Sequence, residues 1–163
     1  MLHMIVAPCG AGKTTLAINK LAGMWGDKSN ALYLIDSVAG RDQLLQNEKF
    51  RCYDRNWRAY LEQNQEDQDD RLTVMTYACF GTLCRHIPDW YCNLHTLICD
   101  EIQSLSEMSG WERGRKCPDE EQIYGLAYGV IVNCAITGTI KSVIALTATP
   151  EPIYKDLECD PKT

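Results

Sequence analysis

One stretch of this chain reads Ala7-Pro8-Cys9-Gly10-Ala11-Gly12-Lys13-Thr14-Thr15, directly after the short apolar run Met4-Ile5-Val6. Its glycines let successive backbone N–H groups turn inward around an anion, and a helix starting near Lys13 would point its positive end at the same place. Only Ala7 departs from the phosphate-binding pattern G-x-x-x-x-G-K-[ST]. Alanine is tolerated there if the backbone keeps a negative φ. We therefore predict a loop that binds the phosphates of a nucleoside triphosphate.

The residue types in this loop predict separate tasks. A lysine at this position reaches the β- and γ-phosphates, and the following Thr14 hydroxyl is the expected Mg²⁺ ligand. The residues predicted to contact the nucleotide are Pro8, Cys9, Gly10, Ala11, Gly12, Lys13, Thr14 and Thr15.

Length and composition indicate one soluble globular domain. The chain has 163 residues, of which 45% are hydrophobic and 23% charged. A chain of this size buries roughly two-thirds of its unfolded surface without metal or disulfide help. No apolar run approaches the ~18 residues that a membrane span needs, and the N-terminus lacks the pattern of a secretion signal. We expect a cytoplasmic protein without a membrane partner.

The cysteines and charges bear on metal sites and on binding to nucleic acid. None of the nine cysteines forms a C-x-x-C pair, so we expect free thiols, mostly buried, with a zinc site as the alternative. The net charge of −6 argues against a general polyanion-binding surface. An acidic segment (62–70) and a basic cluster (Arg113, Arg115 and Lys116) beside Trp111 are expected to be solvated loops. For the basic cluster, contact with nucleic acid is the alternative.

Hydrophobic periodicity predicts strands that alternate with helices. The predicted strands span residues 4–7, 31–35, 72–75, 94–99 and 143–146. The predicted helices span 14–25, 41–49, 77–86 and 120–137, with Leu16, Leu21 and Met24 inward on the first and Asp119 as N-cap of the last. Residues 50–58 are expected to be irregular and to lead through a short helix into the acidic segment. This alternation indicates an α/β fold, a mainly parallel sheet covered by helices on both faces.

Two further polar segments follow predicted strands, and ligands of such sheets bind beyond the carboxyl ends of the strands. Asp100 can hold Mg²⁺, usually through water, and Glu101 can orient and deprotonate an attacking water. A loop or a helix cap is the simpler alternative for this acidic pair. In Leu146-Thr147-Ala148-Thr149-Pro150, the two hydroxyls can hydrogen-bond the segment 101–103. Alone, this last stretch would be only a strand end and a turn.

Together, A-P-C-G-A-G-K-T-T, L-I-C-D-E-I-Q and A-L-T-A-T-P resemble motifs I, II and III of superfamily 2 helicases and translocases, the DEAD/DEAH-like group. The resemblance covers residues 4–150 and implies a RecA-like P-loop domain, a three-layer sandwich, that binds ATP and Mg²⁺. It further implies that Lys13 binds phosphates, that Thr14 and Asp100 hold Mg²⁺ and that Glu101 activates water. Gln103, Thr147 and Thr149 would couple hydrolysis to movement. Gln103 departs from the Asp or His usual at its position, which leaves the subgroup open.

Weaker matches lie where the family contacts nucleic acid. They make Ser37, Thr76 and Tyr77 candidates for contact with a DNA or RNA strand, with strand ends and a helix N-cap at Thr76 as the alternative. The family also needs a second RecA-like domain, in cis or in trans, which supplies an arginine finger. Thirteen residues follow Pro150. We expect residues 1–163 to be a single RecA-like domain that hydrolyses ATP slowly by itself.

Two other functions are compatible with the sequence. A self-contained P-loop kinase or small ATPase would need a lid, for which Arg113-Gly114-Arg115-Lys116 is the candidate. A nucleotide-dependent docking module could use the four tryptophans, Trp25, Trp57, Trp90 and Trp111, as anchors, although core packing explains them as well.

Overall fold

The computed structural model describes residues 1–50, 52–54 and 72–149. In this part of the chain six strands form one sheet in which every neighbouring pair is parallel. They are β1 (Leu2–Val6), β2 (Ala31–Ile35), β3 (Cys52–Asp54), β4 (Leu72–Thr76), β5 (Thr96–Asp100) and β6 (Ser142–Thr147). Their order across the sheet is β1-β6-β5-β2-β4-β3. The predicted parallel α/β sheet is confirmed.

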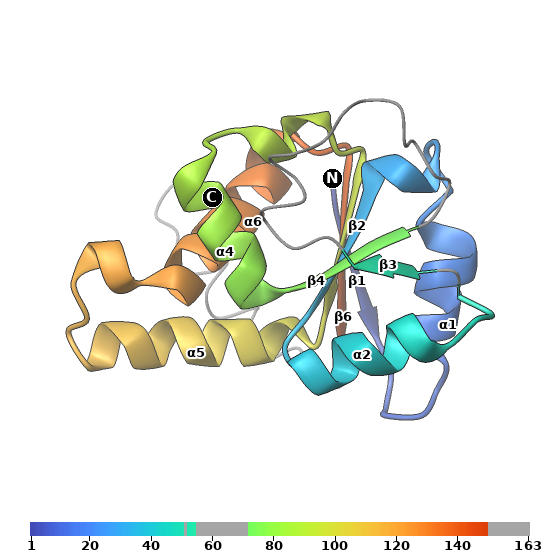
Figure 1. Cartoon of the computed structure of the whole chain (residues 1–163), viewed down its shortest axis with the longest axis horizontal. Coiled ribbons are helices and arrows are strands. Elements are labelled where there is room, and N and C mark those ends of the chain that lie inside the picture. The colour runs from blue at the N-terminus through green and yellow to red at the C-terminus, as the bar shows by residue number, and fades with distance from the viewer. Residues whose placement is uncertain (51, 55–71, 150–163) are drawn as a thin grey trace.

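Helices cover both faces of this sheet and give three layers (Figure 1). One face carries α1 (Lys13–Leu16), which continues as the π-helical turn η1 (Ala17–Leu21), and α2 (Val38–Gln46). The other face carries α4 (Tyr77–His86), α5 (Ile102–Gly114) and α6 (Ile123–Thr137). Short 3-10 turns form at η2 (Lys28–Asn30), η3 (Trp90–Asn93) and η4 (Asp119–Glu121).

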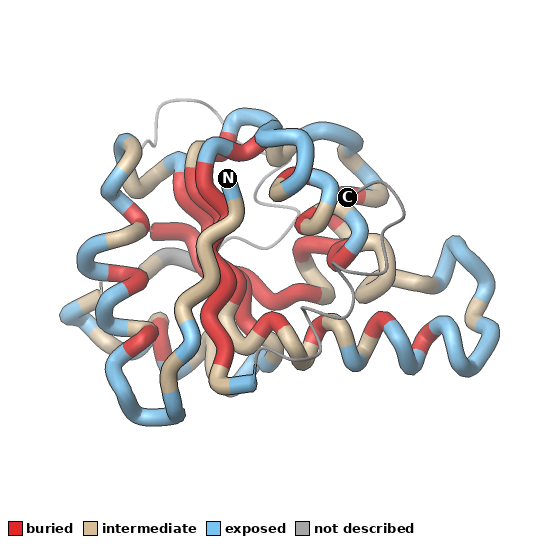
Figure 2. Tube along the Cα trace, turned by 180° about the vertical axis from the view of Figure 1, so that it is seen from behind, coloured by how far each residue is buried: buried red, intermediate tan, exposed pale blue. Residues whose placement is uncertain are grey.

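The alternation of side chains along the strands divides the core into two halves. On β2, Leu32 and Leu34 belong to the cluster under α4, α5 and α6, whereas Tyr33 and Ile35 belong to the cluster under α1 and α2. Successive side chains of a strand point to opposite faces, so a strand covered on both sides is apolar throughout. Figure 2 shows the resulting buried centre, with β1 less buried at the edge of the sheet.

The first helix differs from its prediction. The helical segment ends at Leu21, not at residue 25, and its buried apolar side chains are Ala17 and Ile18. Leu16 and Met24, predicted to face inward, are 44% and 56% exposed. The helix meets the sheet through small and branched residues, while the π-helical turn shifts the later positions around the helix axis. Leu21 is half-buried.

Two elements were not predicted. The edge strand β3 lies in the region expected to be irregular, where three residues are too few to show a period. Helix α5 was not predicted because it is polar along most of its length and buries few apolar side chains, such as Ile102 and Leu105. It projects beyond the sheet and ends at the basic cluster, whose side chains are exposed (Figure 1). The acidic segment 62–70 and residues 55–58 lie outside the described residues, as does Pro150.

The start of α6 also corrects a prediction. Asp119 begins the short turn η4 and does not cap α6, which begins at Ile123 without a local side-chain cap. Instead, the buried Glu112 carboxylate of α5 accepts hydrogen bonds from the backbone N–H groups of Tyr124 (3.1 Å) and Gly125 (2.7 Å). A carboxylate at this end of a helix also faces the positive end of the dipole. The cap therefore comes from a neighbouring helix.

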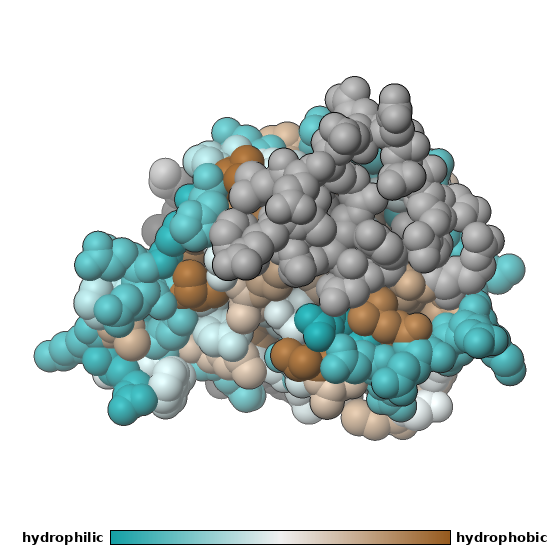
Figure 3. Space-filling model, viewed as in Figure 1, coloured by the Kyte–Doolittle hydropathy of each residue, from teal (hydrophilic) through white to brown (hydrophobic). Residues whose placement is uncertain are grey.

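The remaining expectations concern cysteines, metals and surface. The eight cysteines within the described residues are free; Cys99 and Cys134 are buried as predicted, but Cys9 and Cys92 are exposed, so the thiols are not mostly buried. In this part of the chain no three His, Cys, Asp or Glu side chains form a metal cluster, and no helix is long and apolar enough to cross a membrane. On the face visible in Figure 3, hydrophobic residues form small patches separated by hydrophilic ones.

Candidate nucleotide-binding site

The strand order brings the three predicted motifs together. Because β6 lies between β1 and β5, the carboxyl ends of these strands are neighbours. Val6 pairs with Thr147, and Leu146 pairs with Asp100. The phosphate loop after β1, the threonines after β6 and the acidic pair after β5 therefore converge at one edge of the sheet.

The loop after β1 has the backbone geometry of an anion cradle. Gly10 (φ 80°) and Gly12 (φ 83°) adopt the left-handed conformation that glycine allows without strain. Gly12 caps α1 without any side-chain hydrogen bond, which leaves the first N–H groups of the helix for a ligand. The Ala7 N–H donates to the Thr147 carbonyl (3.1 Å), so Ala7 extends the sheet pairing, and its φ is not positive. Alanine therefore fits at the first position of the motif.

A pocket of about 320 Å³ lies over this loop. Its lining combines the phosphate loop with the acidic pair: Pro8, Cys9, Gly10, Ala11, Gly12, Lys13, Thr14, Asp100 and Glu101. Thr15, also predicted to contact the nucleotide, is exposed beside the pocket and does not line it.

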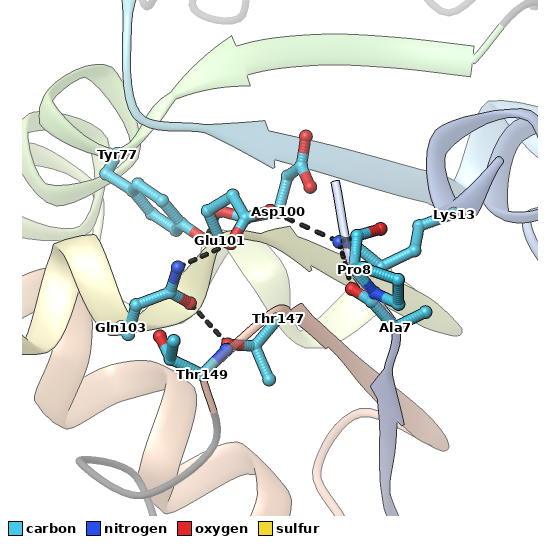
Figure 4. A network of polar contacts seen from close by, with 9 residues as sticks. All are labelled: Ala7, Pro8, Lys13, Tyr77, Asp100, Glu101, Gln103, Thr147 and Thr149. Atoms are coloured by element: carbon cyan, nitrogen blue, oxygen red, sulfur yellow. Dashed lines mark hydrogen bonds and ion pairs between the residues drawn. The ribbon is translucent and has the colours of Figure 1, made fainter. Parts of the chain in front are cut away.

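Lys13 is buried and points into this pocket (Figure 4). Its ammonium donates to the Ala7 carbonyl oxygen (Nζ–O 2.6 Å) and to the Pro8 carbonyl oxygen (3.4 Å). It also forms an ion pair with Glu101 (Nζ–Oε1 3.4 Å). In this conformation three protein oxygens surround the Lys13 ammonium.

Glu101 has an unusual backbone conformation. Its φ of 44° and ψ of 52° lie in the left-handed region, where a non-glycine residue is strained. Such outliers persist where the surrounding structure imposes them, and they concentrate at functional sites. Here the conformation joins β5 to α5 directly and holds the Glu101 carboxylate at the pocket.

Gln103 connects Glu101 to the end of β6. Its amide nitrogen donates to the Glu101 carboxylate, and its amide oxygen accepts a hydrogen bond from the Thr147 hydroxyl (2.6 Å; Figure 4). A carboxylate only accepts hydrogen bonds, so this orientation of the amide is required. The Thr149 backbone N–H donates to the Thr147 hydroxyl oxygen (3.0 Å), but Thr149 contributes no side-chain contact of the kind predicted. The chain of contacts therefore runs from Lys13 through Glu101 and Gln103 to Thr147.

The surroundings of Asp100 disfavour the ionised form of its carboxyl. Burial raises the pKa of its carboxyl, the neighbouring Glu101 carboxylate adds to this rise, and Tyr33 and Lys13 oppose it. The Asp100 backbone carbonyl accepts a hydrogen bond from the Tyr77 hydroxyl (2.8 Å). The site thus holds a partly desolvated carboxylate that a cation would stabilise.

The three nucleic-acid candidates have different environments. Tyr77 is fully buried, with its hydroxyl bonded to β5, so we withdraw it as a contact for a strand bound at the surface. Thr76 is buried and caps α4 by accepting the Cys79 N–H (3.2 Å). Ser37 caps α2 in the same way through the Gly40 N–H (3.1 Å), but it is exposed. Ser37 remains a candidate.

Two features of the site were missed by sequence reasoning. The carbonyls of Ala7 and Pro8 hold the lysine in place, and no sequence pattern signals a main-chain acceptor. Tyr33 lies beneath the pocket but reads as one more core residue in an apolar strand. Tyr33 pairs with Ile98, two residues before Asp100, and this proximity depends on the pairing of β2 with β5, which are distant in sequence.

The comparisons with known proteins agree with this geometry. Residues 2–152 match the family described as type III restriction enzyme, res subunit. A search of the curated proteins found no match to the chain. The match spans almost all of the chain and includes the phosphate loop, the acidic pair and the threonines after β6. The chain therefore belongs to the type III restriction enzyme res subunit family, and it forms a helicase-like ATP-binding domain with a RecA-like P-loop fold.

Proposed function

We propose that this domain powers a nucleic-acid-dependent helicase or translocase of the DEAD/DEAH-like group, and that it hydrolyses ATP with Mg²⁺ when a second RecA-like domain completes the site. The observation that carries the proposal is the chain of contacts from Lys13 through Glu101 and Gln103 to Thr147. These contacts link the phosphate loop to the end of β6, so a change at the nucleotide would be transmitted to Thr147.

The donor set of the pocket fits a hydrated Mg²⁺. Thr14 offers a hydroxyl and Asp100 a carboxylate, and hard oxygen ligands of this kind suit Mg²⁺, which keeps most of its water. When bound, Mg²⁺ would neutralise charge that develops on the β- and γ-phosphates. Burial raises the pKa of the Asp100 carboxyl, and a cation bound beside it would favour the ionised form.

The other residues supply binding and proton transfer. Lys13 exchanges the Ala7 and Pro8 carbonyls and Glu101 for phosphate oxygens, because an ammonium pairs more strongly with phosphate than with neutral acceptors. This exchange releases the Glu101 carboxylate. One of its oxygens then orients a water and accepts its proton while the water oxygen bonds to the γ-phosphorus and the bond from that phosphorus to the ADP oxygen breaks. Gln103 holds the second Glu101 oxygen and passes any movement of the carboxylate to Thr147.

The described pocket lacks one part of such a site. Lys13 is the only cationic side chain among the residues that line it. An arginine that stabilises transition-state charge can be worth ~10³ to 10⁵ in rate. We therefore propose that a second domain supplies it and that nucleic acid crosses the same edge of the sheet, near Ser37.

The structure favours this proposal over both alternatives. The lid candidate of a kinase lies at the far end of α5, roughly 18 Å along the helix from Glu101 at ~1.5 Å per residue. There, Arg115 lies over the exposed Trp111 ring, 4.6 Å from its centre, and neither residue lines the pocket. A docking module would need several exposed tryptophans as anchors. Among the described residues only Trp111 is largely exposed, and Trp57 lies outside them.

The experiment compares phosphate release from Mg·ATP by the wild-type domain and by Glu101→Gln, with and without single- and double-stranded DNA and RNA. We expect slow release by the wild type and loss of that release in Glu101→Gln, with ATP binding retained. Rapid release that needs no nucleic acid would contradict the proposal. So would phosphoryl transfer to a small acceptor.

A further inference from the structure

Beneath the pocket, β2 carries a tyrosine whose side chain is fully buried, Tyr33. Within the described residues, its hydroxyl makes no hydrogen bond that meets normal limits of distance and angle. Native proteins rarely leave a buried hydroxyl without a partner, because its lost hydration is then not replaced. Neighbouring groups that align with the hydroxyl only when the site is loaded would account for this observation.

The position of Tyr33 in the sheet points to that partner. Tyr33 pairs with Ile98 of β5, and Asp100 follows two residues later on the same face of the sheet. Side chains within reach of the hydroxyl include Thr14 and Asp100, although neither forms a well-aligned hydrogen bond with it. These are the two residues that we propose as holders of Mg²⁺.

We propose that Tyr33 is a positioning residue for the magnesium ligands. Its hydroxyl donates to the Asp100 carboxylate and accepts from the Thr14 hydroxyl, so that one buried group fixes the orientation of both oxygen ligands.

The chemistry of the three groups supports this arrangement. An ionised carboxylate only accepts hydrogen bonds, whereas a phenol both donates and accepts. A threonine oxygen that binds a cation still carries a proton to donate, and the phenol oxygen can accept it. The arrangement gives each of the three groups a partner in a region where water is largely excluded.

The test measures ADP affinity by calorimetry for the wild type and Tyr33→Phe, each with Mg²⁺ and with EDTA. This substitution removes one oxygen and keeps the packed ring. We expect Tyr33→Phe to weaken Mg·ADP binding by about tenfold, the size of one charge-assisted hydrogen bond. Affinity for ADP in EDTA should stay within twofold of wild type. The matched control is Tyr128→Phe, a buried tyrosine of α6 on the opposite face of the sheet.

A second comparison uses Asp100→Asn, alone and combined with Tyr33→Phe. If Tyr33 acts through Asp100, the tyrosine substitution should add less than twofold in the Asp100→Asn background. Full additivity would overturn the inference.

The inference rests on the proposed function, and the outcomes separate the two. Wild-type Mg·ADP binding that is unchanged in Tyr33→Phe overturns the role of Tyr33 alone. A Tyr33→Phe protein that is more stable without ligand and unaltered in its Mg²⁺ dependence overturns it as well, because the hydroxyl would then be only an unpaired core group. A wild-type domain that binds no nucleotide overturns the proposed function and this inference with it.

Discussion

Gln103→Glu tests whether the amide joins Glu101 to Thr147 as described. The substitution preserves the shape of the side chain and the oxygen that accepts from the Thr147 hydroxyl. It replaces the nitrogen that donates to Glu101 by an oxygen. The variant therefore loses one hydrogen bond and places two carboxylates side by side at neutral pH.

The expected cost follows from the exposure of the pair. A hydrogen bond to a charged group contributes about 1.5–3 kcal/mol. Glu101 is 30% exposed, so water screens the new repulsion and the total stays near 2 kcal/mol. For a domain of this size, that loss lowers Tm by about 4–8 °C.

The pH dependence is the sharper part of this prediction. In the folded variant the two adjacent carboxylates repel each other. This repulsion raises the pKa of the pair above the values in the unfolded chain. The folded variant therefore binds protons more tightly than the unfolded variant. Its loss of unfolding free energy relative to wild type shrinks as pH falls and grows as pH rises. Thermal unfolding from pH 4.5 to 8 measures the difference. Gln43→Glu, the same change at an exposed position of α2, is the control.

Either of two results would refute this reasoning. A Gln103→Glu protein as stable as wild type at pH 8 would mean that the amide nitrogen does not contact Glu101. A deficit that is the same at every pH would mean that the second carboxylate stays remote from the first.

Three further predictions follow from the described contacts. Glu112→Ala removes a buried carboxylate that accepts hydrogen bonds from two N–H groups of α6. We expect the unfolding free energy, measured by denaturant titration, to fall by about 3 kcal/mol. Glu107→Ala, at an exposed position of α5, should change it little. Asp100→Asn should raise the Tm of the nucleotide-free domain at pH 7–8, and this gain should shrink in acid. The reason is that burial raises the Asp100 pKa, so the wild type loses stability as that carboxyl ionises. A variant less stable than wild type at every pH would disprove this. Mg·ADP should slow iodoacetamide labelling of Cys9, which lines the pocket, and leave the exposed Cys92 unaffected, as read by peptide mass spectrometry; equal labelling with and without nucleotide would count against the site.

The sequence predicts best where local signals are strong. The strand 31–35 and the helix 77–86 match the structure residue for residue, because one is a continuous apolar run and the other is capped by Thr76. The motif residues converge as predicted because the carboxyl ends of parallel strands share one edge of the sheet. The predicted hydrogen bond between the threonines after β6 and the segment 101–103 forms between Thr147 and Gln103.

The missed features depend on contacts between distant segments. The cap of α6 comes from Glu112 on another helix, so the local sequence around Asp119 suggested the wrong residue. Helix α5 shows little apolar periodicity because few of its side chains face the core. Tyr33 is placed at the site only by the pairing of β2 with β5.

Every role proposed for this site requires that the domain bind nucleotide through Lys13. Calorimetric titration with Mg·ADP measures this directly on the wild type, on Lys13→Ala and on Lys20→Ala, an exposed lysine of the same helical segment. We predict saturable binding by the wild type and by Lys20→Ala, and at least about tenfold weaker binding by a folded Lys13→Ala. No binding by the wild type, or equal binding by Lys13→Ala, would contradict a nucleotide site built on Lys13.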